Sequence, residues 1–202
     1  LCYKKINKYE LALGIIQKYL FFSNKEDDNF YYYANILKAN CYVAIGQFDI
    51  VIKIYNCLLA QIPGHEDPLL GYIYNNLGSV YLDKADYKNS LKYYEMAEKI
   101  RDVVDKPNLC YTLVEKSEVF LKQHHYVEAI KTIKLGLSGA ELYKNYECLL
   151  KGNYILLHLY EDTDDILNLK NSCLIIADLL NANNNLDELN LIYIKLSLIY
   201  LN

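Results

Sequence analysis

The histidines are the side chains of this chain best suited to bind a metal ion or to transfer protons. His124 and His125 are adjacent, and neighbouring residues on a helix point roughly 100° apart, so this pair does not chelate one ion. His65 follows a proline–glycine pair and stands beside Glu66 and Asp67, a composition typical of a loop. We therefore interpret both groups as solvated turn or loop residues.

An acidic run, Glu161, Asp162, Asp164 and Asp165, has the charge to attract calcium. A calcium-binding loop of the EF-hand type needs a glycine at its sharp turn, and none stands there. Carboxylates also stabilise the first turn of a helix by capping its free N–H groups. The run is therefore predicted to cap the helix that follows it.

The cysteines show no spacing typical of a zinc site or a redox motif, both of which need close pairs. The six are Cys2, Cys41, Cys57, Cys110, Cys148 and Cys173. We expect six free thiols in a reducing, cytoplasmic compartment. With no glycine-rich phosphate loop and no nucleophile at a recognisable distance from a base, the sequence predicts neither an enzyme nor a cofactor.

Charge and hydropathy exclude two further classes of partner. The formal net charge is -4 and Arg101 is the only arginine, so this chain is not expected to bind nucleic acid. No window of 18 apolar residues and no signal peptide is visible, which predicts no contact with a membrane. Because the chain starts without methionine inside an apparent helix, we expect it to be part of a longer protein.

The elements that position these side chains follow from an internal repeat of 39 or 40 residues. One aromatic ladder is Tyr3, Tyr42, Tyr81, Phe120, Tyr160 and Tyr200. A second ladder, six residues further along, is Tyr9, Phe48, Tyr87, Tyr126 and Ile166. Two ladders in register over most of the chain indicate stacked, similar units.

Each unit is predicted to contain two antiparallel helices. In the third unit the apolar residues have helical spacing from about Pro68 to Asp83, a polar turn follows, and a second helix begins near Tyr87. Small residues recur where the helices cross, which allows their axes to approach within roughly 8–10 Å. The predicted fold is all-α: one right-handed superhelix of about five and a half helix pairs, spanning residues 1–202. Its units are approximately 1–31 (partial), 32–70, 71–109, 110–149, 150–189 and 190–202 (partial).

The third unit resembles the tetratricopeptide repeat (TPR). The residues that carry the resemblance are Leu77, Gly78, Tyr81, Tyr87, Tyr94 and Ala97, with Ser90 where alanine is usual. The period exceeds the family's usual 34 residues, and we expect longer second helices and inter-unit loops to hold the extra residues. The first unit lacks most of its first helix.

The resemblance implies that the first helix of each pair lines a concave, peptide-binding groove. The residues at groove-facing positions include Tyr33, Asn40, Tyr72, Asn75, Asn76, Ser79, Tyr111, Glu118, Lys122 and His158. Asparagine offers a donor and an acceptor to an extended peptide, and tyrosine adds rigid contact area. The alternative is that these asparagines are merely solvated and the tyrosines pack on neighbouring units. The groove does not match the carboxylate clamp of chaperone-binding arrays, because Asp83, Glu115 and Glu118 would repel a carboxylate.

Long-period arrays of this kind resemble the C-terminal domains of Gram-positive quorum-sensing regulators of the Rap, PlcR and NprR kind. The resemblance implies a peptide-sensing domain of a transcriptional or quorum-sensing regulator whose N-terminal effector domain is missing here. The alternative is a general protein–protein interaction scaffold with no small peptide ligand. Two copies could also pair through the terminal repeats. Specific peptide binding would separate the first two hypotheses.

Overall fold

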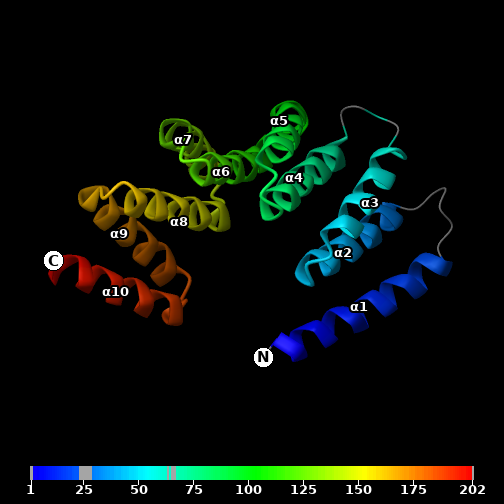
Figure 1. Ribbon diagram of the computed structural model, residues 1–202, viewed down its shortest axis with the longest axis horizontal. Coiled ribbons are helices and arrows are strands. Elements are labelled where there is room, and N and C mark those ends of the chain that lie inside the picture. The colour runs from blue at the N-terminus through cyan, green and yellow to red at the C-terminus, as the bar shows by residue number, and fades with distance from the viewer. Residues whose placement is uncertain (1, 23–28, 63, 65–66, 202) are drawn as a thin grey trace.

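The computed structural model describes residues 2–22, 29–62, 64 and 67–201. Over these residues the chain forms ten α-helices and no β-strand (Figure 1). The helices are α1 (Cys2–Phe22), α2 (Asn29–Ala44), α3 (Phe48–Leu59), α4 (Pro68–Asp83), α5 (Tyr87–Val104), α6 (Lys106–Lys122), α7 (Tyr126–Leu142), α8 (Tyr146–Asp162), α9 (Ile166–Ala182) and α10 (Leu186–Leu201).

The helices are arranged as four complete pairs, α2–α3, α4–α5, α6–α7 and α8–α9, flanked by α1 and α10. They follow one another along an arc, with α1 to α3 in one arm, α4 to α7 across the top and α8 to α10 in the other arm (Figure 1). The all-α repeat architecture predicted from the sequence is therefore confirmed. No described helix is long and apolar enough to span a membrane.

The helix boundaries show which elements contain the residues by which this repeat is longer than the usual TPR unit. Each first helix begins three or four residues before the predicted unit boundary, as at Asn29 for 32 and Lys106 for 110. The second helix α5 runs to Val104, and only Asp105 separates it from α6. Most of the extra length therefore extends helices. At the start of the chain α1 is unbroken, so the predicted remnant of an earlier helix forms part of it.

One turn geometry ends five of the helices. Its second residue has a positive φ of 53–58°, at Ala85, His124, Lys144, Asp164 and Asn184. The N–H of the next residue bonds a carbonyl five positions back, as in the 2.9 Å bond from Asp86 to Tyr81. This satisfies carbonyls that a helix end leaves free. Because the turn is so short, consecutive helices must fold back on each other.

Small residues permit close packing inside a pair. Gly78 of α4 lies under the ring of Tyr94 on α5, and a methyl group at Gly78 would come within 2.7 Å of that ring. Ser90 donates a 2.8 Å hydrogen bond to the Gly78 carbonyl. Tyr94 and Ala97 are fully buried. The repeat positions of the sequence therefore correspond to the points where the helices of a pair cross.

Candidate functional site

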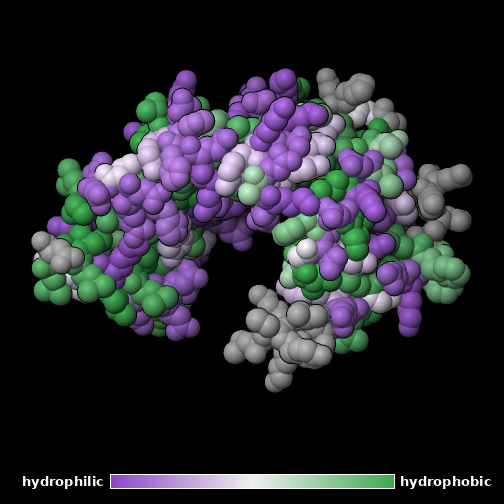
Figure 2. Space-filling model, in the orientation of Figure 1, coloured by the Kyte–Doolittle hydropathy of each residue, from purple (hydrophilic) through white to green (hydrophobic). Residues whose placement is uncertain are grey.

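A mostly apolar hollow lies between the first helices α2 and α4. It measures about 820 Å³. The space-filling view shows that the molecule as a whole curves around a wide open space between its two arms (Figure 2). Its lining is Tyr32, Tyr33, Ile36, Leu37, Asn40, Ile62, Asp67, Pro68, Leu69 and Tyr72. The Tyr33 side chain is 61% exposed and the Tyr72 side chain is 37% exposed, so solvent or a ligand can reach both rings.

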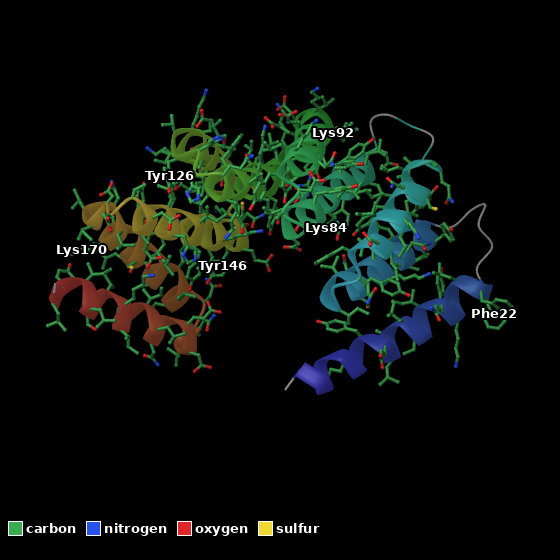
Figure 3. All side chains as sticks on the ribbon, viewed as in Figure 1. Phe22, Lys84, Lys92, Tyr126, Tyr146 and Lys170 are labelled. Carbon is green, nitrogen blue, oxygen red and sulfur yellow. The ribbon has the colours of Figure 1, made fainter. Side chains whose placement is uncertain are left out.

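The predicted groove residues belong to four first helices, α2, α4, α6 and α8. Tyr33, Asn40 and Tyr72 line the hollow itself. Asn76 and Ser79 are half-buried on α4, Tyr111 and Glu118 are half-buried on α6, and Lys122 and His158 are exposed. Lys92 of the second helix α5 lies on the outer side of the arc (Figure 3). Lys84, directly after α4, forms a 2.8 Å ion pair with Asp49 of α3.

Asn75 has a different surrounding from the one expected of a free groove amide, because it is only 7% exposed. Its side-chain oxygen accepts hydrogen bonds from Arg101 Nη1 at 3.1 Å and from Thr112 Oγ1 at 2.9 Å. Its Nδ2 donates to Glu115 Oε2 at 2.7 Å. Asn75 therefore links α4 to α5 and α6. Its hydrogen bond to Glu115 also orients that carboxylate.

Arg101 anchors this network at the end of α5. Its Nη1 also donates to the Asn108 carbonyl at 3.0 Å and to Thr112 Oγ1 at 2.8 Å. Burial lowers the pKa of Arg101, and the charges of Asp105 and Glu115 oppose this. The one arginine of the chain thus serves a structural task between units three and four.

Charged side chains of α4, α6 and α8 lie next to this network. Lys151 Nζ of α8 forms a 2.7 Å ion pair with Glu115 Oε1 of α6. Burial opposes the charged form of Lys151, but the attraction and hydrogen bond of Glu115 together outweigh it and raise the pKa of this ammonium. Desolvation and Glu115 raise the pKa of Asp83 at the end of α4, although Lys151 acts in the opposite direction. These groups are close enough to influence one another.

Two buried tyrosines of the second helices point toward polar side chains of the first helices. Tyr55 and Tyr94 occupy equivalent positions, 39 residues apart, and both are fully buried. The Tyr55 hydroxyl donates to Asn40 Oδ1 at 3.5 Å. Burial, followed by the charges of Glu115 and Glu118, raises the pKa of Tyr94. The Tyr94 hydroxyl therefore lies close enough to Glu115 and Glu118 to be affected by their charges.

The other candidates for chemistry have structural places. His124 and His125 are exposed in the turn before α7, as predicted, and His124 Nδ1 lies 2.9 Å from the Tyr126 hydroxyl. Asp165 caps α9 by accepting from the Asn168 N–H at 3.2 Å, which confirms the capping prediction. Hydrogen bonds from Asn168 lower the pKa of this carboxyl.

The remaining candidates are His158, the loop histidine and any metal cluster. His158 Nδ1 lies 3.1 Å from Glu161 Oε2, and Glu161 also pairs with Lys195 of α10. His65 and Glu66 lie outside the described residues. Within the part of the chain that the structure describes, no group of three histidine, cysteine or acidic side chains could hold a metal ion.

The sequence did not indicate that residues before α4 line the hollow. It also did not indicate the buried polar network of Asn75, Arg101 and Thr112. Ile62 and Asp67 line the hollow although they do not belong to the aromatic ladders. Asp67 caps α4 with a 2.8 Å bond to the Leu69 N–H, and an aspartate directly before a proline is a signal for this. Thr112 gave no signal, because a threonine inside a helix has no distinctive pattern.

No protein-family model matches the sequence, and neither does any curated protein sequence. Similar folds do occur among solved structures. The Q17M crystal structure of a Podosopora anserina putative kinesin light chain with nearly identical TPR-like repeats has a TM-score of 0.67 at 11% identity, over 92% of this chain and 93% of that one.

Two regulators are also similar in structure. A Rap protein complexed with competence and sporulation factor has a TM-score of 0.61 at 16% identity, over 99% of this chain and 59% of that one. The apo quorum sensor NprR from B. thuringiensis has a TM-score of 0.54 at 22% identity, over 96% and 59%. This chain thus spans about three fifths of the length of both regulators. At these identities the likeness concerns the fold, which is that of a TPR-like helical solenoid.

Proposed function

We propose that this chain binds a short peptide or an extended protein segment along its groove, as the sensing part of a regulator. The observation that carries the proposal is the apolar hollow of about 820 Å³ between α2 and α4, where Tyr33 and Tyr72 stand exposed. Ligand sites are typically concave and largely apolar, with a few polar groups that fix orientation. The hollow has this character.

Charged side chains of α4, α6 and α8 indicate which charge the ligand carries. Asp83, Glu115 and Glu118 provide three carboxylates, against the two ammonium groups of Lys122 and Lys151. Glu115 is already paired with Lys151, which leaves Asp83 and Glu118 available to a ligand. The ligand we propose therefore carries an apolar side chain for the hollow and a positive charge for these carboxylates.

The solved neighbours support this proposal by analogy. One of them, the Rap protein, is complexed with competence and sporulation factor, and another, NprR, is a quorum sensor. A regulator of that kind acts inside the cell, so the proposed compartment is the cytoplasm. Pairing of two copies remains a prediction, which the exposed apolar residues Leu11 and Ile15 of α1 and Leu191 and Ile194 of α10 favour.

Selection from a library of random short peptides tests the proposal. We expect the immobilised chain to enrich peptides in which a lysine or arginine lies near a large apolar residue. Glu118→Lys should weaken binding of an enriched peptide about tenfold or more, because it reverses a charge in a partly desolvated site.

The matched control is Glu95→Lys, which makes the same charge change on the exposed side of α5 and should leave affinity nearly unchanged. A library that yields no enriched sequence would overturn the peptide proposal and favour the scaffold. Enriched peptides that bind the Glu118→Lys chain equally well would overturn the charge preference.

A further inference from the structure

The two end helices of the described array are halves of different repeat units (Figure 1). In the repeat register α10 has the place of a first helix, because Tyr200 is equivalent to Tyr81 of α4, and α10 packs on α9 as α4 packs on α3. From Tyr9 onward α1 has the place of a second helix, because Tyr9 is equivalent to Tyr87 of α5, and α1 packs on α2 as α5 packs on α6. Among the described helices, neither end helix has the partner that completes its own pair.

The contact inside a complete pair is best seen in α4–α5, where it depends on stacked rings and one small residue. The ring of Tyr93 on α5 stacks on Tyr81, with centroids 5.3 Å apart, and on Tyr74, at 6.3 Å. Gly78 lies between these two tyrosines along α4 and touches the ring of Tyr94. These contacts cover the crossing face of the first helix with the crossing face of its second helix.

The helix α10 carries the same crossing face, but there it is exposed. Tyr193 and Tyr200 are equivalent to the two stacked tyrosines of α4, and they are 52% and 66% exposed. Ser197 stands between them at the position of Gly78 and is also exposed. Ser117 holds this position in α6, where it is fully buried. Both serines donate to the carbonyl three residues before them, at 2.6 and 2.7 Å, so only the covering helix differs.

The helix α1 carries the opposite half of this contact. Ile15 stands at the position of Tyr93 and is 71% exposed. Ile16 and Ala12 stand at the positions of the two α5 residues that contact Gly78, and both are half-buried. Apolar side chains on such a face gain free energy when another apolar face covers them.

We propose that α1 of one copy packs on α10 of a second copy, so that the two end helices complete a helix pair. Ile15 would then contact Tyr193 and Tyr200, and Ile16 would cross at Ser197, whose small side chain lets the helix axes approach. A second copy is the partner that fits, because the two exposed faces are the two halves of the contact that joins each complete pair. This interface is independent of the proposed peptide binding.

The proposed contact joins two different surfaces, so it is heterologous. It leaves one α10 and one α1 available at the ends of each assembly, and it therefore builds a row or a ring of copies. A two-fold dimer would instead join α10 to α10 or α1 to α1. The stoichiometry and the behaviour of variants at each end distinguish these arrangements.

Sedimentation velocity of the 202-residue chain tests the association. We expect the average mass to rise with protein concentration beyond the mass of a dimer. Ile15→Glu and Tyr193→Glu should each keep the chain monomeric, because either variant places a carboxylate in the apolar contact. The control Val127→Glu changes an exposed apolar residue of α7, away from both ends, and should associate like the parent chain.

An equimolar mixture of the two end variants tests the geometry. The Ile15→Glu chain keeps an intact α10 and the Tyr193→Glu chain keeps an intact α1, so the mixture should form a dimer and stop there. A single end variant that dimerises alone would show two-fold pairing and overturn the proposal. A mixture that stays monomeric would do the same, as would a parent chain that is monomeric up to about 1 mM. Circular dichroism verifies that each variant is folded, and Tyr200→Glu serves as a second α10 variant.

Discussion

Replacing Gly78 by alanine should lower the free energy of unfolding by about 1–3 kcal/mol, the usual cost of overpacking a tight core. The added methyl carbon would lie 2.7–2.9 Å from three atoms of the Tyr94 ring. That ring is fully buried, and Ser90 holds the Gly78 carbonyl from the same side. Because neither neighbour has room to retreat, α4 and α5 must separate.

Urea unfolding followed by circular dichroism measures this effect, and the chain offers its own control. Gly139→Ala on α7 adds the same atom at ordinary contact distance, 3.4 Å from Cys110 Cβ, and should be neutral or stabilising by up to about 1 kcal/mol. Adding Tyr94→Leu to the Gly78→Ala chain should recover part of the loss, because a smaller side chain leaves space. Equal stabilities of the two glycine variants would show that the crossing is not close-packed.

Asn75→Ala should lower the free energy of unfolding by about 1–3 kcal/mol, because it leaves buried polar groups without their partner. Arg101 and Thr112 each lose an acceptor, and Glu115 loses a donor at 2.7 Å. Helical content should stay the same in the folded state, since alanine favours helix.

Asn76→Ala is the matched control on the adjacent residue of α4. The buried Nδ2 of Asn76 has no hydrogen-bond partner within the described residues, so its removal should cost little or stabilise slightly. Thermal and urea unfolding of the two variants can be compared directly. If Asn76→Ala is as destabilising as Asn75→Ala, the polar network does not carry the stability that its geometry implies.

Repetition made most of the fold predictable. The aromatic ladders fixed the helix order because equivalent residues serve equivalent contacts, as Tyr81 and Phe120 do by placing a carbonyl at each helix end. Tyr33 and Tyr72 recur in the same register, and both line the hollow between α2 and α4. Local pattern is sufficient for these features, because each unit contacts mainly its neighbours.

The site could be predicted only in part, because its polar contacts join distant residues. The bond from Asn75 to Glu115 spans 40 residues and two units, and helical periodicity does not reveal which groove position sinks below the surface. Arg101 was visible as a solitary arginine, but its partners were not.

Calorimetric titration of a selected peptide against Tyr72→Ala tests the central claim, that the groove binds the ligand, most directly. Tyr72 is 37% exposed and lines the hollow between α2 and α4, so its ring should supply contact area that alanine lacks. We expect affinity to fall roughly 10- to 100-fold, while Lys88→Ala on the exposed side of α5 changes it little. Equal affinity of the Tyr72→Ala chain and the parent chain would contradict the groove as the binding site.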